Sequence, residues 1–403
     1  MQFHRIQNVN IEHPFYFRAL GLVTVRIESA GSASEKVSLA ALPLADGEQI
    51  REEIHRFHQA RDPVDSGDLP AAPILTRSLT DLVIHGLTNN RAWIILGALG
   101  ALYSQVSDNI NTYVAGLGID IGGYVASSGA IALALIAISA LMLAVVFVAA
   151  ISVLGSIFSY YRYELYRTDE AFRVRRGLLT RHEINMRKSR IQSVRIRRDW
   201  LDMILGRMNV IFEQISHATP GQASGFGADK HILVPSVESQ HTDRLTSEAL
   251  SAERIANLTF TGISRRYFKK LAGITCSAYL YFGLMVVAFI PGGSAWIILL
   301  LPPLALHIAL LYMSWKRWGL AIDGGIIVVR RGVIGVDHTL IPAFKIQEVS
   351  RIRTPLMKRH GLSSIRFSVA SRSTSVPFLP DQVVRNAIDY CLFQTESTDR
   401  SWM

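Results

Sequence analysis

The sequence predicts an α+β membrane protein in which transmembrane helical hairpins alternate with antiparallel β-barrel domains, each capped by a C-terminal helix. Three observations lead to this fold class. The 403 residues are 49% hydrophobic and only 18% charged, whereas soluble proteins carry about 25% charged residues. Long uncharged stretches alternate with polar segments. The polar segments also resemble one another at fixed offsets, which indicates one unit repeated along the chain.

Four stretches are predicted to span a membrane, which requires roughly 20 largely apolar residues in one helix. The clearest lies within residues 130–158, which carry no charge. Residues 271–290 and 296–315 form a second hairpin around the turn at 291–294. Residues 92–106 are shorter and end in polar residues. We include them because an odd number of spans would place chemically similar flanks on opposite sides of the membrane.

The distribution of charge predicts the orientation. The segment between the first two spans contains Asp108 and Asp120 but no lysine or arginine, and the 291–294 turn has no charge. All 42 basic residues therefore fall on the other side, which is the pattern of a cytoplasmic face. We expect a multi-pass protein of the cell membrane with both termini in the cytoplasm. The net charge of +10 then reflects orientation, and we expect no nucleic-acid partner.

Three copies of one motif mark the repeat. They are anchored by the triplets Arg5-Ile6-Gln7, Arg190-Ile191-Gln192 and Lys345-Ile346-Gln347. Fourteen residues after each glutamine lies a glycine: Gly21, Gly206 and Gly361. In the second and third copies a glycine also lies fourteen residues before the triplet isoleucine: Gly177 and Gly332. We interpret these glycines and the Ile-Gln pairs as structural positions of the repeat.

Each complete copy is predicted to contain strands followed by a helix. Residues 172–175 alternate apolar and basic side chains, as a half-buried strand does. Residues 199–205 could form a short helix that Gly206 ends, since glycine favours the position after a helix. The predicted divisions are a partial domain at 1–60, a linker and hairpin at 79–160, a domain at 162–255, a linker and hairpin at 258–315, and a domain at 316–396.

At these motifs the chain resembles the YdbS/YdbT-like bacterial membrane proteins. The resemblance rests on the Arg-Arg-Gly turns, the Ile-Gln triplets, the later glycines and the Gly-Leu-Thr or Gly-Ile-Ser element before each hairpin. It implies tandem bacterial pleckstrin-homology (PH) domains between pairs of transmembrane helices. The predicted β-barrels would then be PH-like domains.

The first copy is shorter than the others. It begins at Met1, four residues before its triplet, so it lacks the strands that hold the Arg-Arg-Gly turn in the other two copies. Half a barrel would expose unpaired strand edges. We consider two explanations. Either the start lies too late or the gene is truncated, with another hairpin and the missing strands expected before Met1, or residues 1–60 complete a barrel with another copy or chain.

Arginines are the best functional lead. Six of them flank the turns and strands of the second and third copies: Arg175, Arg176, Arg197, Arg198, Arg330 and Arg331. Domains tethered to spans bring such side chains within a Debye length of the membrane surface, where each is worth about 1 kcal/mol against anionic lipid. We consider them candidates for binding lipid headgroups. The alternative is that they are solvated strand faces that orient the protein.

Other motifs are weaker. His307 is the only histidine within a span, and either a proton-path role or a hydrogen bond to a neighbouring helix remains open. His55 and His58 are spaced for one helix face but lack the further ligands that zinc requires. We find no catalytic constellation, no metal motif and no cofactor motif, so we expect a protein that is not an enzyme.

The leading functional hypothesis is a non-catalytic scaffold whose cytoplasmic PH-like domains bind an unknown protein partner, with envelope maintenance as one candidate setting. The alternative is sensing of anionic membrane lipids by the arginine-rich faces. A transporter component is a third class, but the spans offer few polar side chains beyond His307. Small residues in the first predicted span also permit close helix approach and a homo-oligomer, namely Gly97, Gly100, Ala101 and Ser104.

Overall fold

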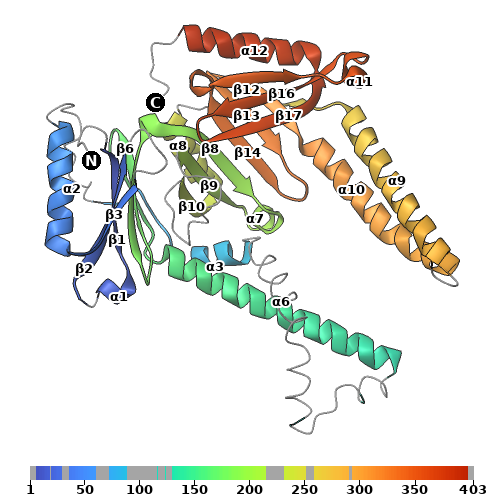
Figure 1. Ribbon diagram of the computed structural model, residues 1–403, viewed down its shortest axis with the longest axis horizontal. Coiled ribbons are helices and arrows are strands. Elements are labelled where there is room, and N and C mark those ends of the chain that lie inside the picture. The colour runs from blue at the N-terminus through green and yellow to red at the C-terminus, as the bar shows by residue number, and fades with distance from the viewer. Residues whose placement is uncertain are drawn as a thin grey trace. The chain divides into compact units, whose positions relative to one another are not determined.

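The structure is a computed structural model of the whole chain. It describes residues 6–18, 20–29, 36–59, 72–88, 116, 123, 129–214, 231–250, 258–289 and 293–397. The chain divides into two compact units, one made of residues 76–164 and 175–181 and the other of the remaining residues. Figure 1 labels the helices and strands.

Three helices in the described part of the chain are long and apolar enough to cross a membrane: 131–160, 265–289 and 297–317. They correspond to α6 (Ala130–Tyr160), α9 (Arg265–Phe289), and η4 (Gly293–Leu300) continued by α10 (Leu301–Arg317). At most 6% of the most apolar window of each is buried by protein, so these surfaces require lipid around them. The predicted span at 92–106 lies outside the described residues.

A short helix, α3 (Leu79–Thr88), packs tightly against α6. The hydroxyl of Ser152 donates to the carbonyl oxygen of Gly86 at 2.6 Å, and that of Ser156 donates to the carbonyl oxygen of Leu82 at 2.8 Å. A Cβ atom at Gly86 would lie 3.0 Å from the backbone nitrogen of Val153. The predicted linker is therefore a helix whose glycine permits backbone contact with the span.

The strands that the structure describes form two seven-stranded sheets and one three-stranded sheet. Sheet A contains, in spatial order, β3 (Lys36–Pro43), β2 (Leu22–Ser29), β1 (Ile6–His13), β7 (Arg181–Arg187), β6 (Ala171–Arg176), β5 (Glu164–Arg167) and β4 (Leu75–Thr76). Sheet B contains β10 (His231–Glu238), β9 (Arg207–Gln214), β8 (Ile191–Arg198), β14 (Val336–Pro342), β13 (Ile326–Arg331), β12 (Gly319–Asp323) and β11 (Thr261–Gly262). Sheet C contains β15 (Glu348–Ile352), β16 (Leu362–Val369) and β17 (Arg372–Pro380).

Each copy contributes its strands to two sheets, and closed barrels are not found among the described residues. The second copy places β4–β7 in sheet A and β8–β10 in sheet B. In a closed barrel β7 and β8 would lie in the same sheet. Here β7 pairs with β1 of the first copy, and β8 pairs with β14 of the third copy. The edge hydrogen bonds that would close a barrel are therefore made with neighbouring copies.

The same kind of pairing joins the first copy to the second. Its strand β1 is antiparallel to β2, with Val9 opposite Ile27, and joins β7 of the second copy on its other edge. Strands β1–β3 of residues 6–43 thus extend a sheet of the second copy by edge pairing. The first strand of each four-stranded half, β4 or β11, comes from the segment before a span.

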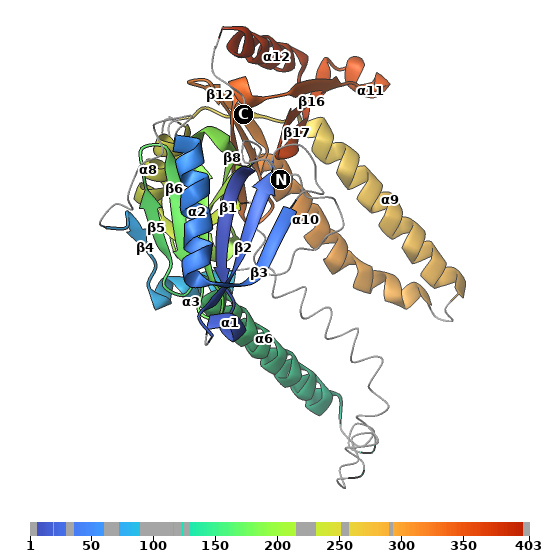
Figure 2. The ribbon, with the colours of Figure 1, turned by 60° about the vertical axis from the view of Figure 1, so that its left-hand side comes forward.

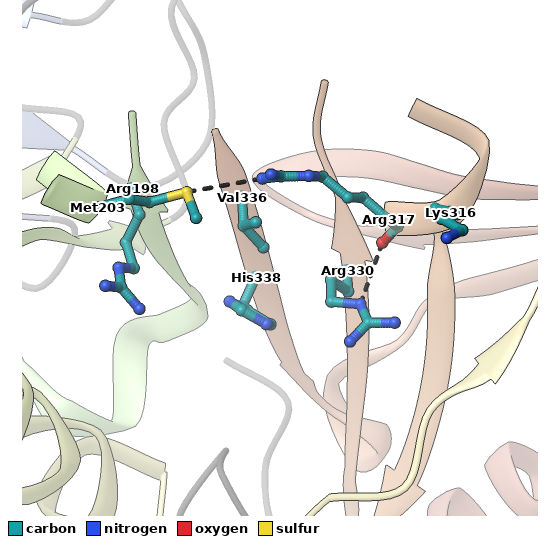
Figure 3. A pocket seen from close by; sticks show the side chains of 7 residues that line it. All are labelled: Arg198, Met203, Lys316, Arg317, Arg330, Val336 and His338. Atoms are coloured by element: carbon teal, nitrogen blue, oxygen red, sulfur yellow. Dashed lines mark hydrogen bonds between the residues drawn. The ribbon is translucent and has the colours of Figure 1, made fainter. Parts of the chain in front are cut away.

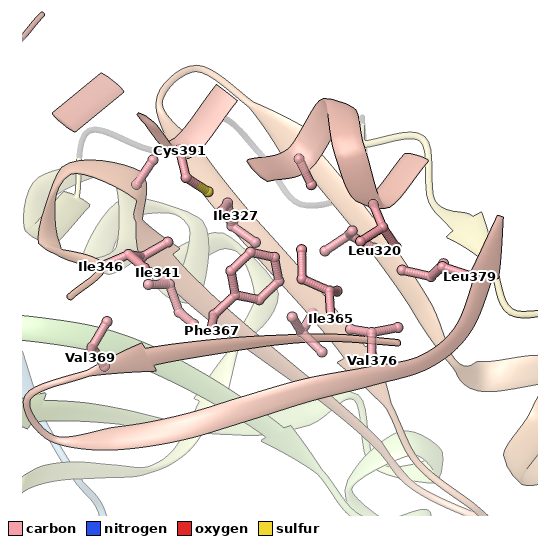
Figure 4. Close-up of a cluster of buried hydrophobic side chains, with 14 of the residues drawn as sticks. Leu320, Ile327, Ile341, Ile346, Ile365, Phe367, Val369, Val376, Leu379 and Cys391 are labelled. Atoms are coloured by element: carbon pink, nitrogen blue, oxygen red, sulfur yellow. The ribbon is translucent and has the colours of Figure 1, made fainter. Parts of the chain in front are cut away.

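A helix follows the last strand of each copy: α2 (Leu44–Gln59), α8 (Ser239–Leu250) and α12 (Asp381–Glu396). In the first copy α2 lies along the strands (Figure 2). Ile54 of this helix is buried in one cluster with Val23 and Val25. In the third copy the core lies between β12–β14 and β15–β17, around Phe367, and α12 covers it with Val384, Ala387 and Cys391 (Figure 4). Burial raises the pKa of the Cys391 thiol to about 12.

The glycines of the repeat occupy equivalent turns. Gly21, Gly206 and Gly361 have φ angles of +67°, +65° and +62°. They follow the short helices α1 (Phe15–Arg18), α7 (Trp200–Ile204) and α11 (Pro355–Lys358), in the left-handed conformation that glycine adopts without strain. Gly177 and Gly332 lie in hairpins where a Cβ atom would overlap the carbonyl oxygens of Thr180 and Gly335, respectively.

Polar contacts fix the junction between the second and third copies. The ammonium group of Lys345 donates to the carbonyl oxygens of Ser189 and Ile191, the latter at 2.7 Å. Glu213 on β9 accepts hydrogen bonds from Arg195 of its own copy and from Arg372 of the next, the latter at 2.9 Å. Burial opposes ionisation of Glu213, but these arginines hold its pKa below the ordinary value.

Candidate functional site

A basic pocket lies at the end of α10, next to sheet B (Figure 3). Its volume is about 310 Å³. Seven residues line it: Arg198, Met203, Lys316, Arg317, Arg330, Val336 and His338. Four of these side chains carry a positive charge and none is acidic. The pocket therefore has the charge of an anion-binding site.

Five elements meet at this pocket. Arg198 ends β8, Met203 belongs to α7, and Lys316 and Arg317 end α10. Arg330 lies on β13, and Val336 and His338 lie on β14. The strand pairing places Val336 opposite Arg198. The pocket thus exists because β8 of the second copy pairs with β14 of the third.

A glycine allows the close approach of the β13–β14 turn to β8. A Cβ atom at Gly335 would overlap the carbonyl oxygen of Arg198 and lie 3.0 Å from the Cα atom of Asp199. The carbonyl oxygen of Gly335 in turn accepts a hydrogen bond of 2.8 Å from Nη1 of Arg317. This turn therefore links the end of the membrane helix to both copies.

Two of the four cations are held in place by hydrogen bonds. Nε of Arg330 donates to the carbonyl oxygen of Arg317 at 3.0 Å, and its guanidinium carbon lies 4.4 Å from the ring centroid of Phe260. Nη1 of Arg317 is also 3.6 Å from the sulfur of Met203. A ligand would meet side chains that are already ordered, which lowers the entropic cost of binding.

No residue that lines the pocket supplies a negative charge to balance its cations. Nε of Arg198 is buried and has no hydrogen-bond acceptor among the residues that the structure describes. His338 is neutral at pH 7, because burial, together with the charges of Arg330 and Arg198, lowers its pKa to about 4. Burial, followed by the charge of Arg317, also lowers the pKa of Arg330. An anion would relieve the repulsion among these cations.

Exposed apolar side chains lie beside the pocket. On and just after α7 they are Trp200, Ile204 and Leu205, with exposed fractions of 51%, 70% and 43%. On the β13–β14 turn they are Val333 and Ile334, at 41% and 48%. Gly335 follows them directly and bonds to the end of α10. We call these five residues the apolar rim.

Of the six arginines proposed from the sequence, Arg198 and Arg330 line the pocket. The remaining four make local contacts. Arg197 pairs with Asp199 at 3.2 Å, and Arg331 approaches Asp337 at 4.0 Å. The guanidinium carbon of Arg176 lies 4.7 Å from the ring centroid of Tyr160, and Arg175 is half-buried on β6.

Sequence reasoning missed His338, Met203 and Val336 as pocket residues, and it assigned Lys316 and Arg317 only to membrane orientation. The signal for the two cations was their position at the end of a span, directly before a strand. His307 lies on α10, with its ring centroid 6.2 Å from that of Tyr279. Within the described residues no group of three or more His, Cys, Asp or Glu side chains could hold a metal ion.

Spans, repeated antiparallel half-domains and C-terminal helices define an integral membrane protein built from repeated PH-type units. The chain belongs to the bacterial PH domain family, which matches residues 1–58, 118–251 and 271–392. It is also 22% identical over 386 residues to the UPF0699 transmembrane protein YdbT of Bacillus subtilis (strain 168). The aligned region covers 92% of this chain and 75% of that relative. Neither comparison indicates a catalytic family.

Proposed function

We propose that this membrane protein acts without catalysis and binds phosphate-bearing headgroups of anionic lipids in the basic pocket. The observation that carries the proposal is the set of four cations without a carboxylate at the end of a membrane helix. Arginine and lysine side chains bind phosphate through charge-assisted hydrogen bonds. The sequence raised headgroup binding as an alternative, and the four cations of the pocket support it.

The location favours a lipid over a soluble anion. Arg317 ends both α10 and the span, so the pocket begins at the depth where lipid phosphates lie. The apolar rim beside it offers Trp200 and four aliphatic side chains, a composition suited to the boundary between acyl chains and headgroups. With the predicted orientation, this boundary belongs to the cytoplasmic leaflet, which carries negative surface potential.

The experiment uses the full chain extracted in a neutral detergent. Native mass spectrometry would count bound phosphatidylglycerol, with phosphatidylcholine as the neutral lipid. The test variant combines Arg198→Gln and Lys316→Gln. At about 1 kcal/mol per cation, the double change should weaken binding roughly 30-fold. We expect phosphatidylglycerol to bind to the wild type in preference to phosphatidylcholine.

The matched control combines Arg266→Gln and Lys269→Gln. These two exposed residues lie on the first turns of α9 and do not line the pocket. They should leave binding within about twofold. Equal loss in both double variants would mean that only diffuse charge attracts the lipid, and the pocket proposal would be wrong. Binding of inorganic phosphate as tight as that of the lipid would assign the pocket to a soluble anion.

The scaffold function is a second candidate, and one observation favours it. Strand β15 is an edge strand of sheet C, whereas its counterparts in the other copies are paired on both sides. A partner strand could be held there without use of the basic pocket.

A further inference from the structure

The first strand of each three-stranded half has one edge available for a neighbouring copy. In the first copy this strand is β1, which pairs with β7, and in the second it is β8, which pairs with β14. In the third copy it is β15, which pairs with β16 and with no other strand that the structure describes. An edge strand presents backbone N–H and C=O groups to a further strand.

Side-chain burial differs between the paired and the unpaired strand. Three side chains of the second copy are at most 1% exposed: Gln192, Ser193 and Ile196. Their counterparts in the third copy are all exposed: Gln347, Glu348 and Arg351. The same positions are therefore covered in one copy and accessible in the other, and the difference falls along the edge that β14 occupies on β8.

The third copy has a carboxylate at the cross-strand pair that, in the second copy, binds an arginine of the neighbouring copy. On β8 and β9, Ser193 lies opposite Glu213, and Glu213 accepts a hydrogen bond from Arg372 of the next copy. On β15 and β16, Glu348 lies opposite Ser368. Serine and glutamate have exchanged strands at the same cross-strand pair. The carboxylate that a neighbour's arginine needs is thus still present at the open edge.

The backbone acceptors have counterparts as well. Lys345 of the third copy donates to the carbonyl oxygens of Ser189 and Ile191 of the second. One repeat later, the equivalent carbonyl groups belong to Phe344 and Ile346. A lysine or arginine at the triplet of a further PH unit would find its acceptors there.

The structure assigns the open edge of β15 to strand pairing with a PH domain of a second polypeptide. The occupant is the fourth strand of that domain's four-stranded half, antiparallel to β15, as β14 is to β8. Among the residues that the structure describes, the two strands of that type, β7 and β14, are already paired. The inference rests on the scaffold candidate and does not use the basic pocket. Backbone pairing of this kind supplies affinity, and the flanking side chains supply specificity.

The experiment is performed on the full chain in the membranes of the cell that produces it. A photoreactive phenylalanine derivative replaces Ile352, whose side chain is 38% exposed at the end of β15. Mass spectrometry of the cross-linked peptides then identifies the partner segment. We expect a cross-link to a strand directly before an Ile-Gln triplet in a PH domain of another polypeptide.

A charge reversal tests the role of the edge carboxylate. Glu348→Lys should lower the cross-linking yield about tenfold, because the new ammonium group would repel the partner's arginine. Glu396→Lys, the same change at the exposed end of α12, should leave the yield unchanged. A cross-link to β15 of a second copy of this chain, to a protein without a PH domain, or to no protein would overturn the inference. Phosphatidylglycerol binding by the same preparation reports separately on the pocket.

Discussion

Lys345 donates a hydrogen bond of 2.7 Å to the carbonyl oxygen of Ile191, the central residue of the same triplet one repeat earlier. The contact joins the Lys-Ile-Gln triplet of the third copy to the Arg-Ile-Gln triplet of the second, so the motif that marks the repeat also connects its copies. Only 4% of Lys345 is exposed, and burial lowers the pKa of its ammonium group to about 8.

Replacing Lys345 with methionine should destabilise the protein. The apolar stem is conserved in shape, but the carbonyl groups of Ser189 and Ile191 lose their donor, and a buried unsatisfied group costs about 1–3 kcal/mol. Thermal unfolding in detergent should show a lower midpoint. Lys358→Met, at an exposed position on α11, should leave the midpoint unchanged, and equal shifts for both variants would contradict the role of the junction.

Acidification should destabilise the protein through His338. Its pKa is lowered from 6.5 to about 4 in the folded state, so the unfolded chain binds more protons between these pH values. The stability that the neutral imidazole contributes is fully present above about pH 6.5 and is lost as the pH falls towards 4. At pH 5 the loss in unfolding free energy is about 2 kcal/mol. Denaturant unfolding at pH 7 and pH 5 measures it.

His338→Gln is the control for that measurement. The variant lacks the titrating group, so its loss of stability between pH 7 and pH 5 should be smaller than that of the wild type by about the same 2 kcal/mol. An identical pH dependence in both proteins would show that other groups account for the effect.

Gly335→Ala should disturb both the pocket and the junction. The new methyl group would overlap the carbonyl oxygen of Arg198, so the β13–β14 turn must move away from β8. We expect a loss of about 1–3 kcal/mol in unfolding free energy and weaker phosphatidylglycerol binding. Gly273→Ala provides the control, since no atom lies within 4 Å of the added Cβ. Wild-type stability in Gly335→Ala would contradict the close packing.

The apolar rim should contact lipid. A spin label attached at Ile204→Cys, in a background with Cys276→Ser and Cys391→Ala, should be relaxed more by oxygen than by a water-soluble nickel complex, because oxygen partitions into acyl chains. The same label at Ser247→Cys, exposed on α8, should show the opposite preference. Strong relaxation of the label at position 204 by nickel would place the rim in water.

The sequence predicted the spans within the described residues and the family, but not how the strands pair. Uncharged runs such as 130–158 have one physical solution in lipid, and fixed offsets between glycines reveal a repeat without any knowledge of contacts. Edge pairing has no such signal. The alternation of side chains in β8 indicates that one face is buried. Any neighbouring strand could make the backbone hydrogen bonds of β8, however, so nothing local indicates that Val194 lies opposite Leu340.

The candidate site was predicted only in part for a related reason. Arg197 and Arg198 are adjacent in sequence, yet Arg197 pairs with Asp199 while Arg198 points to the pocket. Hydropathy places Lys316 and Arg317 at the end of a span, but it does not show which strands face them. The pocket depends on pairing between copies, which composition and spacing do not encode.

The division of each copy between two sheets bears on how the protein is made. Strands β8–β10 leave the ribosome before α9 and α10, whereas their partner β14 follows both helices. Sheet B therefore cannot be completed until the second hairpin has been synthesised and inserted, and the edge of β8 stays open in the meantime. Such long-range pairing forms slowly and exposes strands to aggregation. Membrane insertion thereby becomes a step in the folding of the aqueous domains.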